Sequence, residues 1–412
     1  MHPLKVRSYR LLRFLERYTK TDMVYLTSGG FWLFAGQALS ALSALILAVA
    51  FANLVEPEKY GNYKYILSLA GIIGTLTLTG FGTAVARGAA RGYSGTLSYA
   101  FQTALQWSVA MLIVSVGIGT YYFLQGNILL GSALFIIGAT APVIAASSFY
   151  RPYLMGSREF KRATLYGALQ STGPALAVLC GVLLQVPFLL LILIYFVSSA
   201  AACFTLYSLA ARSAGGAVDP EASRIGKHLS VMNIISVIAG RLDNLLLFQL
   251  LGGTHLAVFA FAVAIPDTIR GSFKNFASLA MPKFIGKSKV ELKESVSTKS
   301  ILIFFGATTV TGAYILAAPY IFQLFFPVYL ESVVYSQVYA VTLLFTLILS
   351  TAYFDAQKGI KERYILSTFS SIVTILTAVV GIYWFGLWGA VWARIVARIL
   401  IASASAILIA RH

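Results

Sequence analysis

Long apolar segments recur along the whole chain and are separated by short polar turns. They lie at residues 28–54, 62–83, 97–123, 128–149, 163–184, 187–210, 229–251, 256–281, 300–325, 333–355, 364–385 and 387–410. An α-helix needs about 20 mostly apolar residues to cross a hydrocarbon layer roughly 30 Å thick, and each segment reaches that length. The pattern therefore predicts an all-α polytopic membrane protein with about twelve transmembrane helices.

Basic residues are distributed unequally between the two sides of these segments. Lys and Arg cluster before the first segment and after the second, fourth, sixth, eighth and tenth, whereas the opposite side keeps only Lys59 and Lys64. Because cytoplasmic loops retain Lys and Arg, the pattern predicts that both termini are cytoplasmic. It also supports the count of twelve, since a missed or invented helix would break the alternation.

The longest connection divides the segments into two sets of six. Residues 211–228 contain Gly215-Gly216 and Asp219-Pro220, so we predict a cytoplasmic linker between an N-terminal lobe (24–210) and a C-terminal lobe (229–412).

A weak internal repeat supports this division. At an offset of 196 residues, Leu54-Val55 and the turn that follows match Leu250-Leu251 and its turn. Internal repeats are common in secondary transporters, whose substrates bind near the middle of the membrane between the halves. Residues 1–23 are basic and amphipathic, which is typical of an interfacial helix on an anionic leaflet or of a solvated tail.

Composition excludes most other classes of protein. The chain has 412 residues, 58% hydrophobic and 11% charged, with a net charge of +17. Its mean hydropathy is +0.81, whereas a soluble domain has roughly 25% charged residues. The cations form short clusters and no continuous stripe, so we predict no nucleic-acid partner. Cys180 and Cys203 lie inside apolar segments and the histidines are scattered, so we predict no metal site and no cofactor. The outer turns are too short for a catalytic domain, so we expect no enzymatic activity.

Charged residues within the predicted helices are the candidates for function. An ionised side chain at mid-bilayer costs about 2.5 to 3.5 kcal/mol, so each must face a partner or a wet cavity. The set is Arg241, Asp243, Asp267, Arg270, Lys274, Arg394 and Arg398, of which Lys274 is left aside because its side chain can reach the inner interface.

Spacing separates these charges into groups. Asp267 and Arg270 are three residues apart and can pair within one helix. Arg241 and Asp243 are two apart, project in different directions and cannot neutralise each other. Arg394 and Arg398 repel each other on one face, so that face needs an anion.

Four arginines against two aspartates leave two positive charges, which match a pyrophosphate diester. Arg also forms forked hydrogen bonds with phosphate oxygens. We therefore expect Arg241, Arg270, Arg394 and Arg398 to bind a pyrophosphate. Asp243 and Asp267 are the candidates for coupling to H+ or Na+. Neutral polar side chains of the first half are expected on the other wall: Gln37, Ser40, Gln102, Gln106 and Gln170.

Other interpretations stay open at this point. In one alternative, ion pairs between the seventh and eighth helices are purely structural. In another, Arg394 and Arg398 extend along the membrane to reach lipid phosphates, as long basic side chains do. Trp384, Trp388 and Trp392 fit an interfacial aromatic belt or stacking platforms for sugars.

Several motifs resemble those of Wzx-type polysaccharide (O-antigen) flippases, in order and spacing along the whole chain. They are Gly29-Gly30-Phe31-Trp32 with Gly36-Gln37, Pro57-Glu58-Lys59-Tyr60-Gly61-Asn62-Tyr63, Arg241-Leu242-Asp243-Asn244-Leu245-Leu246-Leu247 with Leu251-Gly252, Ala356-Gln357-Lys358-Gly359 with Lys361-Glu362, and Gly386-Leu387-Trp388-Gly389-Ala390.

This resemblance implies a two-lobed, MATE-like fold of the multidrug/oligosaccharidyl-lipid/polysaccharide exporter superfamily. It also implies that the protein moves an undecaprenyl-pyrophosphate-linked oligosaccharide between leaflets of a bacterial inner membrane, with a glycan polymerase and membrane lipids as partners. One departure is that related peptidoglycan-precursor flippases carry essential cations in the first lobe, whereas the first two segments here have none at depth. A multidrug or cation exporter of the same superfamily is the alternative function.

Overall fold

The computed structural model describes residues 23–280, 289–345 and 360–411. The predicted interfacial segment up to residue 22 and most of the basic loop after the tenth predicted helix lie outside these residues, as does the start of the loop after the eighth. Every element described in these ranges is a helix.

Each of the twelve predicted segments has a helical counterpart, which confirms the all-α fold class. The helices are α2 (Met23–Leu54), α3 (Pro57–Ile73), η1 (Gly74–Thr77), α4 (Phe81–Ala90), α5 (Thr96–Leu124), α6 (Ile128–Ser147), α7 (Tyr150–Gly156), α8 (Phe160–Leu183), α9 (Phe188–Ala211), α10 (Ala222–Leu251), α11 (Gly253–Ala280), α12 (Lys289–Phe325), η3 (Pro327–Tyr329), α13 (Ser332–Ala340), η4 (Val341–Leu343) and α15 (Ile360–Arg411). Within the described residues, eight helices are long and apolar enough to cross a membrane, or nine if one bent pair counts as a span. Helix α15 contains the last two predicted segments, joined at Gly386, where φ is +56°.

The second predicted segment is not one straight helix. Its two parts, α3 with η1 and then α4, meet at a bend of 57°. At this bend the Gly80 N–H donates a hydrogen bond to Ser230 Oγ at 3.0 Å. A Cβ at Gly80 would lie 2.4 Å from the Ser230 nitrogen, so the glycine lets the bend contact the backbone of α10.

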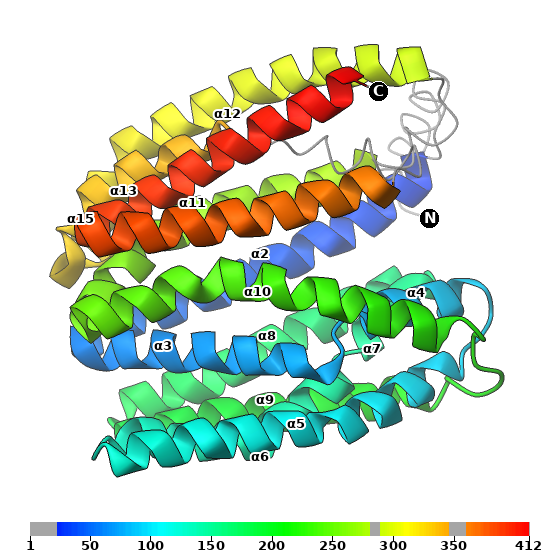
Figure 1. The fold of residues 1–412 in the computed structure, drawn as a ribbon, viewed down its shortest axis with the longest axis horizontal. Helices are drawn as coiled ribbons and strands as arrows, with labels where there is room; N and C mark the ends of the chain where they lie inside the picture. Colours follow the sequence, from blue (N-terminus) through cyan, green and yellow to red (C-terminus); the bar gives the residue numbers. More distant parts are fainter. Residues whose placement is uncertain (1–22, 281–288, 346–359, 412) are drawn as a thin grey trace, which may run out of the picture.

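The long helices run roughly along one direction, and the start of α2 and the end of α15 lie at the same end of the bundle (Figure 1). We call this the terminal end, where α2 begins and α15 finishes. The opposite end, the turn end, holds the short connections at Val55-Glu56, Gly252 and Gly386. We call α2–α9 the first lobe and α10–α15 the second lobe; that they are separate domains stays a prediction.

The predicted linker over 211–228 is shorter in the structure, because α10 already begins at Ala222. The connection is bound to the first lobe. Gly95 N–H donates to the Ala217 carbonyl at 3.2 Å, and Asp219 N–H donates to Thr96 Oγ1 at 2.9 Å. Glu221 forms an ion pair with Arg87 of α4. The linker is therefore a docked segment rather than a free tether.

Aromatic rings join the two lobes near the turn end. Tyr60 of α3 stacks on Phe261 of α11, with ring centroids 4.7 Å apart. Phe51 of α2 lies 5.2 Å from Tyr60, and Tyr329 of η3 lies 4.1 Å from Phe261. All four side chains are buried. The lobes are thus closed against each other at this end.

Two glycines bring the backbones of the lobes close together, and this contact leads to a prediction. A Cβ at Gly61 of α3 would lie 1.9 Å from the Gly253 carbonyl oxygen of α11. Replacing Gly61 with Ala must separate these backbones, and we expect it to destabilise the protein by about 1 to 3 kcal/mol. Thermal unfolding of the purified protein measures the effect.

The matched control is Gly117→Ala in the exposed face of α5, where a Cβ would meet no atom within 4 Å. Helix propensity favours Ala there by up to about 1 kcal/mol. Equal stability of the Gly61→Ala protein and the wild type would show that the two helices are not in backbone contact.

Candidate functional site

Five of the six predicted buried charges come together inside the second lobe. They are carried by α10, α11 and α15, and the hydroxyl of a tyrosine on α13 lies among them. The members are Asp243, Asp267, Arg270, Tyr339, Arg394 and Arg398, which we call the charge cluster.

Arg394 is the best satisfied cation of the charge cluster. Its Nε and Nη2 both contact Asp243 Oδ2, and its Nη1 lies 3.4 Å from Asp267 Oδ2. The Asp243 side chain is only 5% exposed, and its other oxygen accepts the Asn244 N–H at 2.9 Å. Since both partners have lost most contact with solvent, this pair fixes α15 against α10 and α11.

Asp267 is the centre of the charge cluster. Tyr339 donates its hydroxyl to Asp267 Oδ1 at 2.9 Å and accepts hydrogen bonds from Arg394 at 3.2 Å and Arg398 at 3.3 Å. Arg398 Nη2 also lies 3.5 Å from the same carboxylate oxygen. One carboxylate therefore faces three guanidinium groups, and the tyrosine hydroxyl orders them.

Arg270 is the least satisfied cation of the charge cluster. Its Nε lies 3.7 Å from Asp267 Oδ1, which agrees with the expected pairing within α11, but this buried nitrogen has no hydrogen-bond partner. The Arg270 and Asp267 side chains are 27% and 31% exposed. Among the described members of the cluster, three arginines against two aspartates leave one positive charge in excess, and the accessible end of the cluster is at Arg270.

Arg241 lies apart from the other arginines. Its Nη1 donates to the Leu67 carbonyl of α3 at 3.1 Å, and its guanidinium occupies the space that a side chain at residue 71 would fill. Among the residues that the structure describes, no carboxylate pairs with Arg241. The structure thus brings three of the four predicted arginines together and directs the fourth into the first lobe.

The candidate coupling carboxylates are already engaged. Asp243 is held by Arg394, and Asp267 by three arginines and Tyr339. A proton or sodium ion that binds either carboxylate must therefore compete with a guanidinium group.

Sequence reasoning did not identify Tyr339 as a member of the site. Tyr339 is fully buried, and its hydroxyl contacts three charged groups, Asp267, Arg394 and Arg398. Of the neutral polar residues expected on the other wall, Gln170 lines a cavity together with Arg241, whereas Gln102 and Gln106 are exposed. Leu67 accepts a hydrogen bond from Arg241 through its carbonyl, and Gly71 leaves room for the Arg241 guanidinium. Neither contact depends on a functional side chain, so no sequence signal marks these two residues.

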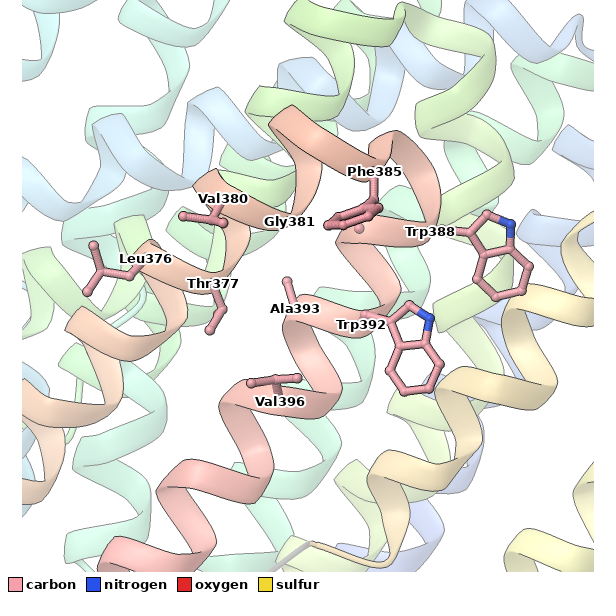
Figure 2. A pocket seen from close by; sticks show the side chains of 10 residues that line it. Leu376, Thr377, Val380, Gly381, Phe385, Trp388, Trp392, Ala393 and Val396 are labelled. Carbon is pink, nitrogen blue, oxygen red and sulfur yellow. The ribbon is translucent and has the colours of Figure 1, made fainter.

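The tryptophans of α15 border an apolar groove. The groove lies between the two arms of α15, and Trp388 and Trp392 stand on one side of it (Figure 2). Thr377 is the single hydroxyl among its lining residues, and Trp384, Trp388 and Trp392 are all exposed. An apolar, outward-facing surface of this kind favours lipid contact over stacking on sugars.

Comparison with solved structures gives the class of fold. The chain matches MATE in complex with MaD5 with a TM-score of 0.66 at 15% identity, over 94% of this chain and 96% of that chain. It matches an inward-facing multidrug resistance MATE family transporter of the MOP superfamily with a TM-score of 0.69 at 15% identity, over 90% and 95% of the two chains. For an outward-facing one the TM-score is 0.58 at 15% identity, over 94% and 96%. No protein-family model and no curated protein matches the sequence.

The protein is an all-helical, multi-pass membrane protein. Its fold is that of MATE transporters of the MOP superfamily.

The pairing of Asp243 with Arg394 leads to a second prediction. Arg394→Gln leaves the buried carboxylate of Asp243 without its cation, and breaking a buried pair in this way costs about 3 to 5 kcal/mol. We expect a corresponding loss of stability in unfolding experiments on the purified protein.

The matched variant is the double substitution Asp243→Asn with Arg394→Gln, which removes both charges and should recover more than half of the loss. A double variant as unstable as Arg394→Gln alone would show that the two residues are not energetically coupled.

Proposed function

We propose that the protein is a transporter, not an enzyme, and that it moves a polyprenyl-pyrophosphate-linked oligosaccharide from the inner to the outer leaflet of a membrane. The observation that carries this proposal is the unmatched positive charge at Arg270, next to Arg398, inside a MATE-like fold. A buried cationic excess favours an anionic cargo.

The pyrophosphate of such a substrate would bind at the accessible end of the charge cluster. The partly exposed guanidinium of Arg270 and the guanidinium of Arg398 are the groups that would bind its oxygens. Arg394 would act by holding Asp243 and Asp267 in place and by adding its charge. This assigns different roles to arginines that the sequence treats alike, and it leaves Arg241 outside the pyrophosphate site.

Alternating access would expose this site to each side of the membrane in turn. In the structure the rings of Phe51, Tyr60, Phe261 and Tyr329 close the turn end. With both termini in the cytoplasm, the closed end would be the outer end. The higher TM-score with the inward-facing transporter agrees with that assignment.

The orientation itself is supported by the distribution of charge. Arginines of the connections gather at the terminal end, where positive charge is expected on the cytoplasmic side. They include Arg87, Arg91, Arg151, Arg158, Arg162, Arg212 and Arg224. We therefore propose a bacterial cytoplasmic membrane as the location, with the lipid-linked oligosaccharide and a glycan polymerase as partners.

An ion gradient would supply the drive through Asp243 or Asp267. Because both carboxylates are paired with arginine, H+ or Na+ binding would release a guanidinium group for the substrate. Cation binding and anion binding would then be linked at one site.

A second candidate function is multidrug export. Two of the similar structures are described as multidrug resistance transporters, so this function fits the fold equally well. A cationic drug would be disfavoured by the excess positive charge, and this makes the two functions separable by experiment.

The test compares glycan export with dye efflux in the source organism. Deletion of the protein should cause lipid-linked repeat units to accumulate on the inner leaflet. Complementation with Arg270→Gln or Arg398→Gln should reduce surface glycan about tenfold or more, since a charged hydrogen bond contributes about 1.5 to 3 kcal/mol. Arg151→Gln, which removes an exposed arginine at the terminal end, is the matched control and should restore export.

Dye efflux should not respond to Arg270→Gln or Arg398→Gln. A deletion strain with a normal distribution of lipid-linked units, or substitutions that alter dye efflux alone, would contradict the flippase proposal and favour the exporter.

A further inference from the structure

Arg241 lies in the wall of a cavity that is separate from the charge cluster. The cavity has a volume of about 340 Å³ and is otherwise lined by helices of the first lobe. Gly71 of α3 provides the space for the guanidinium, because a Cβ there would lie 2.2 Å from Arg241 Cζ. A side chain of the second lobe thus enters a cavity of the first lobe.

The polar groups around the cavity are neutral except for Arg241. Gln170 of α8 and Tyr195 and Ser199 of α9 line the cavity. Among its described lining residues there is no Asp or Glu, and Arg241 makes a single hydrogen bond, to the Leu67 carbonyl. One guanidinium surrounded by hydroxyl and amide groups in a low-dielectric wall is a set of donors for one negative charge.

The size of the cavity limits its occupant. At about 340 Å³ it is near the lower end of the range of about 300 to 1,000 Å³ for small-molecule sites. Water takes up about 30 Å³ per molecule, so the space holds a compact ion with its remaining water and not an oligosaccharide.

We propose that this cavity binds a compact monovalent anion, with chloride as its simplest representative. The anion would contact the Arg241 guanidinium and receive hydrogen bonds from the Tyr195 and Ser199 hydroxyls. One negative charge would match the one unpaired positive charge.

Such an anion would also connect the two lobes. Arg241 belongs to α10, whereas the other polar groups belong to the first lobe. Close by, Asn244 of α10 donates to Ser68 of α3 at 2.9 Å. Binding therefore stabilises the arrangement in which α3 and α10 are in contact, and an anion gradient would bias the position of the lobes.

The experiment uses the purified full-length protein in detergent, at constant ionic strength and with chloride replaced stepwise by gluconate. Gluconate is a bulky anion that the cavity does not accommodate. We expect chloride to raise the unfolding temperature of the wild type by several degrees, and chlorine NMR line broadening to show saturable binding. Arg241→Gln should abolish the difference between the two salts and weaken chloride binding about tenfold or more.

Matched variants keep the proposal falsifiable if Arg241→Gln does not fold. Tyr195→Phe and Ser199→Ala remove only hydroxyl donors and should each weaken chloride binding severalfold. Arg212→Gln removes an exposed guanidinium at the terminal end and should leave chloride binding unchanged.

Two outcomes would overturn the proposal. One is a wild type that is equally stable in chloride and gluconate, or a chloride effect that persists in Arg241→Gln. The other is that inorganic pyrophosphate binds through Arg241 more tightly than chloride, which would make the cavity part of a phosphate site. Neither readout measures glycan transport, so the result is independent of the proposed flippase function.

Discussion

Charge that is buried in an apolar bundle must be matched, and this constraint organises the second lobe. Asp243 is almost completely buried, and the cation that matches it comes from Arg394, 151 residues later in the chain. Asp267 then connects α11 to α13 through Tyr339 and to α15 through Arg394 and Arg398. The helices that pack together in this lobe, α10, α11, α13 and α15, are therefore the same helices that carry the charged and hydroxyl groups of the cluster. The packing of these helices depends on how their charges are paired.

The fold was predictable because its main determinant is local. Apolar length specifies where the helices lie, and each of the twelve segments has a helical counterpart, the tenth as far as residue 345. The direction of crossing, inferred from the basic connections, stays a prediction. The bend between α3 and α4 was not predictable in the same way. It depends on Gly80 contacting the backbone of α10, and hydropathy carries no information about such a distant contact.

The charged members of the candidate site could be named from the sequence, but Tyr339 and the grouping of the arginines could not. Helical spacing correctly indicates that Asp267 pairs with Arg270 and that Arg241 and Asp243 do not neutralise each other. Summing the charges nevertheless treats four arginines as one group. The structure separates them, because Arg241 and Asp243 are two residues apart on α10 and therefore project toward different lobes. Among the described residues, the charge cluster has one positive charge in excess, and the other unmatched charge, Arg241, belongs to a separate cavity.

This separation would matter if the lobes moved relative to each other. The charge cluster lies entirely within the second lobe, so its ion pairs would persist through such a movement. Arg241 is different, since its hydrogen bond to the Leu67 carbonyl and its place beside Gly71 both depend on the contact between α3 and α10. Separation of these helices would take the guanidinium out of its cavity and leave it to find other partners. In such a movement the position of the lobes would depend on what neutralises Arg241, whereas the integrity of the second lobe depends on the pair of Asp243 and Arg394. The two arginines would then have separate effects, Arg241 on the relative position of the lobes and Arg394 on stability.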